Sequence, residues 1–557
     1  MKNKFFKSSL LLAVAGIVLL GSCKKKIEDA YLNPNAATVE PIETILPGVI
    51  GGFTWFSSTQ GTTYGVVTDG SFIGRYIQYY ALNSSGDTWG MMSMLGGAVD
   101  NGGSVWATFY YGQGANVNRI MEWGAEQQKW DYVGVAKAIR AWGLLELTNE
   151  YGEAILKEAF NNNLSQFHYD TQPEFYDACR STCHEALAYL NMTGGNVSQA
   201  NLAIGDAFFN NGDVNKWKKF VYGVLARSFI DISSKDIFKL NNYAYADSAI
   251  KYAGLAMNSN ADNATVKVVG GATSAVNNWW GQFRGNVGAY RQGVYIADIM
   301  SGVNTAAFTG VPDPRRWYML SENLNGTFKG FYPWNGSANT PVANDYPKSF
   351  WRNPVPTATA SYDSGRYVYG DRSPWPMMTA SEMQFIIAEA AYLKGRTNPS
   401  FKDMALTAYT NAINLNFDML TTTYTQNIPA GKDITPAAKA AYISNPLIVP
   451  ATSGGLTLTQ IMLQKYVALY IWGSQETWVD MRKYHYNKDA DPESGKIVYA
   501  DFVVPTLSNL ISTNNSKLTY RMRPRFNSEY LYDVPELTRI GALAVDYNTN
   551  EMWFSQK

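Results

Sequence analysis

Apolar residues recur at steps of three and four positions along most of this chain, and that period constrains its fold more than any other feature. In residues 132–151, for example, Ala136, Ile139 and Trp142 fall on one face of a helix. The pattern therefore predicts a mainly α protein. We expect helices at residues 44–60, 71–82, 116–128, 132–151, 175–190, 214–232, 244–257, 380–393 and 404–416.

The last two of these segments form the cleanest helix pair. Ala388–Gly395 ends the first helix, and Ala405, Tyr409 and Ala412 recur in the second. Small residues let two helices approach closely, while the tyrosine ring fills the groove beside the crossing. This arrangement resembles a tetratricopeptide unit, whose repeat is about 34 residues. We therefore expect a tetratricopeptide-like helical repeat scaffold.

A different kind of sequence lies between these helical groups, at residues 261–376. This stretch holds 9 of the 22 prolines and 6 of the 16 tryptophans, is dense in Gly and Asn, and lacks the helical period. A long irregular stretch inside a compact protein is usually functional when it is ordered. A helical scaffold that carries one long, irregular, aromatic-rich insertion is the layout of a binding protein.

The N-terminus has the order of a secretory signal: three lysines within the first seven residues, the apolar run Leu10–Leu20, and small residues directly after it. The Cys23 that follows resembles the lipobox of bacterial lipoproteins. Eleven apolar residues are too few to span a bilayer, so we expect cleavage before Cys23 and acylation of that cysteine. The expected organisation is a signal peptide at 1–22, a lipidated tether at 23–40 and a single domain at 41–557.

The charge balance argues against a nucleic-acid partner. Without the signal peptide the chain has 43 Lys and Arg against 46 Asp and Glu, whereas nucleic-acid binding calls for a basic face. No apolar run near 18 residues follows Cys23, so we expect no further membrane span. Aromatic residues reach 14% of the chain, enough to fill a large core and leave rings for the surface.

Enzymatic motifs are incomplete. His184-Glu185 begins like a zinc-protease helix, but Ala188 stands where the second histidine is needed. Three histidines in the whole chain give no metal site and no Ser-His-Asp arrangement. The paired carboxylates of a glycosidase leave no signature in a single sequence, and the layout gives no positive sign of them. We therefore expect no cofactor, no metal and no enzymatic activity.

For two groups of residues, a structural role explains the sequence pattern as well as a functional role does. Cys179 and Cys183 lie four apart in an expected helix, which is poor geometry for a disulfide and lacks further zinc ligands beyond His184. We expect two buried, unbridged thiols, with a zinc pair as the alternative. Arg140, between Ala and Trp residues, is expected to pack between helices rather than to hold a ligand.

Glu476, Asp480 and Arg482 form the second group. They could be taken for catalytic carboxylates and a cation, but their one-turn spacing fits a structural ion-pair network. Trp478 lies four residues before Arg482 on the same face, which favours a cation–π contact between the two.

Several segments, in order along the chain, then carry a family resemblance. They are Ala136–Gly152, Ala380–Gly395, Gln464–Leu469 with Gln475–Arg482, and Arg523–Phe526 with Asn527–Tyr530. Together with the lipobox they resemble the SusD/RagB family of surface lipoproteins from Bacteroidetes. The prolines usual after Phe526 are missing here.

The resemblance implies a single SusD-like helical domain, anchored through acylated Cys23 on the outer face of the outer membrane. There the protein would cap a SusC-like, TonB-dependent barrel transporter and hand it an oligosaccharide or, in some relatives, a peptide. The alternatives are a peptide-binding member of the family or a tetratricopeptide-type protein–protein adaptor. A surface glycan hydrolase is a further alternative.

Sugars bind by laying the C–H face of a ring on Trp or Tyr while amides and charged groups meet the hydroxyls. A platform that removes about 100 Å² of apolar surface supplies about 2.5 kcal/mol, so a few platforms with polar contacts reach micromolar affinity. The candidate ligand-binding residues are Trp89, Trp279, Trp280, Tyr290, Tyr332 and Trp334. Core packing is the alternative for each of them, and adjacent residues of an extended segment point to opposite sides, so one ring of Trp279-Trp280 is expected in the core.

Overall fold

The computed structural model describes residues 40–53, 66–83, 102–235, 243–269, 278–282, 287–303, 307–339, 342–352, 365–505 and 512–556. The expected signal peptide, the tether with Cys23 and the candidate Trp89 lie outside these ranges.

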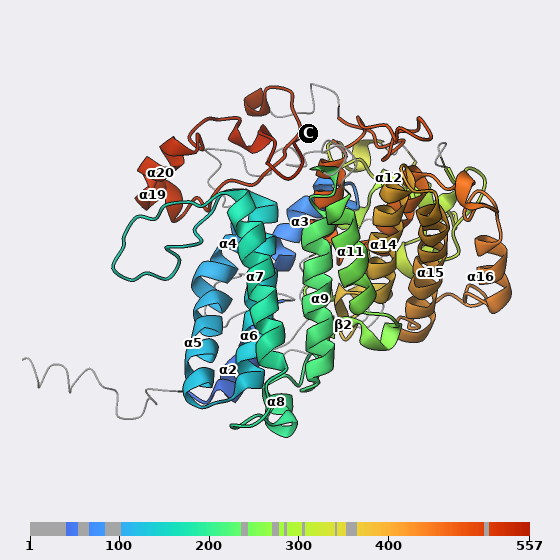
Figure 1. Ribbon diagram of the computed structural model, residues 1–557. Helices are drawn as coiled ribbons and strands as arrows, with labels where there is room; N and C mark the ends of the chain where they lie inside the picture. Colours follow the sequence, from blue (N-terminus) through green and yellow to red (C-terminus); the bar gives the residue numbers. More distant parts are fainter. Residues whose placement is uncertain are drawn as a thin grey trace, which may run out of the picture.

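The scaffold is a row of helices that stand side by side across the molecule (Figure 1). In chain order they are α5 (Gln113–Glu126), α6 (Trp130–Tyr151), α7 (Gln172–Leu190), α9 (Val214–Ile230), α11 (Ala244–Leu255), α14 (Ala380–Gly395) and α15 (Ser400–Thr423). Short connections join α5 to α6 and α14 to α15, which makes each pair an antiparallel hairpin. The mainly α, tetratricopeptide-like scaffold predicted from the apolar period is thus confirmed.

Glycines at the helix crossings let neighbouring parts of the scaffold approach each other closely. A Cβ added to Gly134 of α6 would lie 2.7 Å from Cγ of Leu190 in α7, and one added to Gly143 would lie 2.4 Å from the Phe109 ring. In the α14–α15 hairpin, the buried Tyr409 donates from its hydroxyl to the backbone oxygen of Ile448 at 2.8 Å. The ring therefore fills the groove between small residues, as the sequence pattern predicts.

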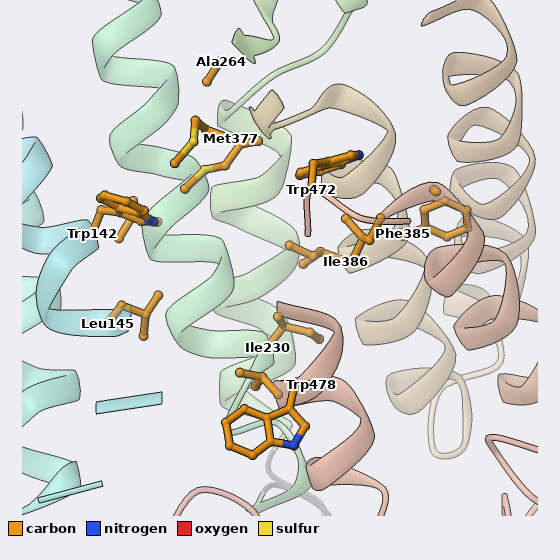
Figure 2. Packing of buried hydrophobic residues seen from close by; sticks show 14 of the residues in the cluster. Trp142, Leu145, Ile230, Ala264, Met377, Phe385, Ile386, Trp472 and Trp478 are labelled. Atoms are coloured by element: carbon orange, nitrogen blue, oxygen red, sulfur yellow. The ribbon is translucent and has the colours of Figure 1, made fainter. Parts of the chain in front are cut away.

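The buried side chains form one continuous core that runs through the row. Figure 2 shows Trp142 of α6, Ile230 of α9 and Phe385 of α14 within this cluster, together with Trp478 of α18 (Ser474–Lys483). The helical hairpins therefore share buried side chains with their neighbours in the row.

Two N-terminal segments differ from the expectation. The helix expected at 44–60 appears as α2 (Ile42–Gly51), with 54–60 outside the described residues. The helix expected at 71–82 is α3 (Val66–Tyr76), and its expected last turn is instead strand β1 (Tyr80–Leu82). That strand pairs antiparallel with β3 (Tyr290–Gln292). A partner some 200 residues away is invisible to local periodicity, which explains the wrong prediction.

The insertion at 261–376 is closed at its base by a second antiparallel pair. Strand β2 (Ala264–Val266) pairs with β4 (Trp375–Met378), which brings the two ends of the insertion together beside the helical row. Between them the chain is mostly irregular, but it contains α12 (Val294–Ser301) and α13 (Arg316–Met319). The expectation that this stretch lacks helices was wrong for these two short elements.

The C-terminal part of the chain lies over the upper end of the row in Figure 1. The segments that carry α19 (Glu529–Tyr532) and α20 (Val534–Arg539) lie above the ends of α4 and α7 in Figure 1. Further elements are α4 (Ser104–Ala107), a π-helix (Thr108–Gly112), α8 (Gln199–Gly205), α16 (Pro436–Ile443) and α17 (Leu458–Ala468). Short 3-10 turns occur at Asn260–Asp262, Ser337–Asn339, Ala343–Asp345, Tyr367–Tyr369, Ser453–Gly455, Ser512–Asn514 and Tyr547–Thr549. Among the described residues, no helix has both the length and the apolar character that a bilayer crossing requires.

Candidate ligand-binding site

Two half-exposed aromatic rings lie against each other in the insertion. The rings of Tyr332 and Trp334 are stacked, with centroids 4.7 Å apart and planes 23° from parallel. Pro333 between them restricts the backbone, and the amides of Asn335 and Gly336 donate to the carbonyl oxygen of Tyr332 at 3.1 and 2.8 Å. The segment is therefore a tight turn that holds both rings in one fixed arrangement.

The turn is fastened to the sheet and helix behind it. The Phe331 amide donates to the carbonyl of Gln292 in β3 at 3.0 Å, and the Val294 amide donates to the carbonyl of Phe331 at 3.2 Å. The Phe331 ring is buried against the edge of Tyr346. A platform supported in this way loses little conformational entropy when a ligand binds, which favours affinity.

The Tyr332 hydroxyl adds a polar group beside the apolar surface. Burial, and then the negative charge of Asp298, raise the pKa of Tyr332 above its ordinary value. The phenol therefore stays protonated in the physiological range and can both donate and accept a hydrogen bond. A flat apolar face with a hydroxyl at its edge suits a sugar ring, whose own surface alternates C–H faces and hydroxyls.

Tyr290 is a partly buried candidate. Its ring stacks on that of Tyr80 with centroids 5.1 Å apart and planes 13° from parallel, so one face is covered by the protein. Tyr80 is itself buried, and its hydroxyl donates to the carbonyl of Gly70 at 2.7 Å. The strand pair β1–β3 thus positions Tyr290 on a fixed aromatic base.

Trp279 and Trp280 do not offer comparable surfaces. Their exposed fractions are 8% and 1%, and the Trp280 ring stacks parallel to that of Trp375 and meets Tyr80 edge-on. The side-chain amide nitrogen of the neighbouring Asn278 donates to the carbonyl of Gly370 at 2.9 Å and therefore points into the protein. One ring of the pair was expected in the core, and Trp280 is that ring. Trp279 is buried as well. Burial is favourable for both because a large indole gains free energy when its surface leaves water.

One half-exposed indole was missed from the sequence. Trp317 in α13 meets the ring of Phe328 edge-on at 4.8 Å, with Arg316 and Lys432 over its own ring at 5.8 and 4.7 Å. The run Pro314-Arg315-Arg316-Trp317 was a usable signal, because it joins an aromatic residue to cations in a Pro-containing loop.

Buried carboxylates beneath the insertion form an ionic network. Arg227 of α9 pairs with Glu382 of α14 at 2.7 Å and lies 3.6 Å from Glu476 of α18. Glu146 of α6 lies 3.9 Å away, and burial raises its pKa to about 7 although Arg227 opposes that shift. The adjoining cavity measures about 30 Å³, room for about one water molecule and not for a sugar. These groups therefore join helices rather than face a substrate.

The expected ion-pair network of α18 is confirmed for Glu476 and Asp480, whose partners come from other helices, whereas Arg482 contacts an aromatic ring instead. Asp480 pairs with Lys465 of α17 at 2.7 Å, and the guanidinium carbon of Arg482 lies 3.5 Å from the centre of the Trp478 ring. Lys483 pairs with Glu389 of α14 at 2.6 Å. All of these side chains are buried.

The other structural interpretations are also confirmed. Cys179 and Cys183 are free and buried, and the described residues contain no cluster of His, Cys, Asp and Glu able to hold a metal ion. Arg140 donates to the side-chain oxygen of Asn118 in α5 at 2.7 Å, which joins the two helices of that hairpin.

Solved structures share this fold. A SusD/RagB family protein from Bacteroides thetaiotaomicron is 18% identical, with 93% of this chain and 99% of that one covered and a TM-score of 0.62. A SusD homologue from Bacteroides fragilis is 17% identical, covering 92% and 100%, with a TM-score of 0.64. A chitin-binding protein is 19% identical, covering 93% and 100%, with a TM-score of 0.63.

The family itself is shown by sequence. None of the curated proteins matches this chain. A family model for SusD-like proteins, described as starch-binding and associating with the outer membrane, matches residues 56–505, which is most of the chain. This match agrees with the order of the sequence segments and with the helical row that carries an aromatic-rich insertion. The chain is therefore a member of the SusD-like family of starch-binding proteins that associate with the outer membrane.

Proposed function

We propose that this protein captures an oligosaccharide at the cell surface and passes it to a SusC-like, TonB-dependent barrel transporter. In this proposal Cys23 is acylated and holds the protein on the outer face of the outer membrane. The description of the family supports binding of a glycan nutrient at that membrane. A structural neighbour that is a chitin-binding protein supports the same class of ligand.

The stacked pair Tyr332–Trp334 is the observation that carries the proposal. It is half-exposed, fixed by a tight turn, and set in the insertion at the end of the helical row. Because the two rings cover one face of each other, the pair is counted as one platform, and the removal of about 100 Å² of apolar surface there supplies about 2.5 kcal/mol. Polar contacts must supply the rest of a millimolar or tighter affinity. Polar groups such as the Tyr332 hydroxyl then select among sugars.

The position of two buried acids supports binding without catalysis. Glu146 and Glu476 are enclosed with Arg227 beside a cavity too small for a sugar, so they offer no pair that flanks a glycosidic bond. We therefore propose a binding protein rather than a hydrolase. Incubation with glycans and measurement of reducing ends over hours would reveal hydrolysis and contradict this part.

Calorimetry with variants tests the platform. Starch- and chitin-derived oligosaccharides and a set of peptides are titrated into the native protein and into Trp334→Ala. We expect binding to one glycan class, weakened at least tenfold by Trp334→Ala because one platform is lost. Trp130→Ala, which removes a half-exposed indole at the start of α6, is the matched control and should bind as the native protein does. Equal affinity of the native protein and Trp334→Ala, or binding of peptides only, would contradict the proposal.

The anchor and the partner are tested in cells. We expect Cys23→Ser to leave the membrane fraction, because the acyl chains are attached at that sulfur. The native protein should co-purify with a TonB-dependent barrel after mild cross-linking. Retention of Cys23→Ser in the membrane at the native level would contradict lipidation at this position.

A further inference from the structure

A cluster of cations surrounds the half-exposed indole of Trp317. We define the cationic patch as Arg316, Lys348, Arg352, Arg366 and Lys432, and the contacts below connect its members through Trp317 and Glu322. Lys432 and Arg316 lie over the Trp317 ring, and Arg366 donates to the carbonyl of Trp317 at 2.6 Å. The patch and the indole therefore form one continuous feature.

One carboxylate serves three of these cations. Glu322 accepts from Lys348 at 3.0 Å and Arg352 at 2.9 Å through one oxygen, and from Arg366 at 2.7 Å through the other. Burial alone would raise the pKa of Glu322, but Arg366 and Lys348 lower it to about 2. Glu322 is thus fully ionised at neutral pH, and its single charge still leaves two positive charges uncompensated.

The neighbouring acids do not restore neutrality. Asp313 is engaged by Arg315 at 2.6 Å, and Asp345 accepts from the side chain of Asn325 at 2.9 Å. Asp433 is exposed next to Lys432. In addition, the Nε atoms of Arg352 and Arg366 are buried without a hydrogen-bond partner within the described part of the chain. Among the described residues, the five cations of the patch therefore face three acids, Glu322, Asp345 and Asp433, and this local balance of charge is positive.

Trp317 of the patch region and the stacked platform belong to one stretch of chain. The rings of Phe328 and Trp317 meet edge-on, and Trp334 lies six positions after Phe328. Six residues span at most about 21 Å, so the two aromatic surfaces are within reach of one extended oligosaccharide.

We propose that the exposed or partly exposed members of the cationic patch, Arg316, Lys348, Arg352 and Lys432, bind the acidic groups of an anionic oligosaccharide, with a sugar ring placed against Trp317. Arg366 is buried and supports the patch from beneath. This inference rests on the proposed function and names the class of ligand. Arginine matches the planar, two-oxygen geometry of a carboxylate or sulfate, while lysine contributes a point charge, and both attract an acidic chain over several ångströms in water. An uncharged glycan would gain nothing from this concentration of cations.

The test compares three oligosaccharides of equal length by calorimetry: a neutral one, one built from uronic acids and one that carries sulfate. We expect the uronic acid or the sulfated chain to bind at least tenfold more tightly than the neutral one at low salt. That preference should shrink at about 0.5 M NaCl, because salt screens charges at the surface. The two acidic arms distinguish recognition of a carboxylate from recognition of a sulfate.

Variants that remove positive charges test whether the cationic patch causes the preference for acidic chains. Lys432→Gln/Arg316→Gln should weaken binding of the acidic chain about tenfold more than it weakens binding of the neutral chain, because the change removes charge and keeps the Trp317 ring. The matched control Lys251→Gln/Lys517→Gln removes two exposed lysines outside the patch and should bind as the native protein does. Because Lys432 is exposed, the single Lys432→Gln variant keeps the test valid if the double variant does not fold.

Two results would overturn the inference. One is that acidic and neutral chains bind with equal affinity while Trp334→Ala still abolishes binding. This result would contradict the inference and would still support the proposed function. The other is an acidic preference that persists unchanged in Lys432→Gln and in the double variant. Absence of binding to any saccharide would instead refute the proposed function together with this inference.

Discussion

The guanidinium carbon of Arg482 lies 3.5 Å from the centre of the Trp478 ring, one helical turn earlier in α18. The same guanidinium donates to the carbonyl of Tyr520 at 3.0 Å, so it ties the C-terminal segment to the helical row. Burial lowers the pKa of Arg482 to about 10, which still leaves the side chain charged at neutral pH. Among the described residues Arg482 has no ion-pair partner, and an aromatic face and two carbonyl oxygens replace its hydration.

Arg482→Lys should therefore destabilise the fold by about 2–4 kcal/mol, because a lysine cannot keep both the flat stacking and the forked hydrogen bonds. Urea unfolding followed by circular dichroism measures the change. Arg119→Lys, on the solvent side of α5, is the control and should change stability by less than about 0.5 kcal/mol. Similar urea concentrations at the unfolding midpoint for Arg482→Lys and the native protein would show that the stacking of Arg482 on Trp478 contributes little to stability.

Glu382→Gln should cost about 3–5 kcal/mol, because it leaves Arg227 buried with its nearest anion removed. The double variant Arg227→Met/Glu382→Leu removes both charges and should recover most of that loss. Urea denaturation of the three proteins gives the comparison. If the double variant is no more stable than Glu382→Gln, the pair contributes through packing rather than charge.

Trp280→Ala and Trp334→Ala should separate stability from binding. We expect Trp280→Ala to lose about 3–5 kcal/mol of folding free energy because it empties a core position, and Trp334→Ala to lose about 1 kcal/mol or less. Thermal unfolding of both variants, alongside the calorimetry above, provides the test. Equal losses of stability would show that Trp334 is a structural residue.

His485 should make stability depend on pH in the alkaline range. Hydrogen bonds to Asp489 at 2.7 Å and to Glu551 at 2.8 Å raise its pKa to about 9. The unfolded value is about 6.5, so the stabilisation is fully present below about pH 6.5 and is lost as pH rises through 9. The residue is partly solvated, so we expect a loss of about 1–2 kcal/mol.

The measurement compares free energies of unfolding at pH 6 and pH 9.5 for the native protein and His485→Gln. We expect the native protein to lose more stability over this interval than the variant does. Glu551 does not interfere, because its lowered pKa affects stability only in acid. Parallel pH profiles would show that His485 is not protonated in the folded state.

Local features of the fold could be predicted from the sequence because they depend on neighbours within one helical turn. The period of three and four located α6, α7 and α14 to within a few residues of their ends. The Trp478–Arg482 contact and the unbridged thiols follow from the same geometry, since both pairs lie four residues apart on one helix.

Features that depend on distant partners could not be predicted. The β1–β3 pair joins residues 80–82 to 290–292, and only that pairing stacks Tyr290 on Tyr80. Trp279-Trp280 looked as suitable for a ligand as Tyr332-Pro333-Trp334 did, because composition does not tell which surface a segment faces.

The sequence by itself determined that this chain is a helical repeat scaffold with one aromatic-rich insertion, because apolar period and composition act locally. Only the tertiary structure decided which indoles leave water and which remain at the surface. The burial of Trp280 and the half-exposure of Trp317 and Trp334 arise from packing between segments far apart in the chain. Burial free energy depends on the area that those segments cover together, and no single segment contains that information.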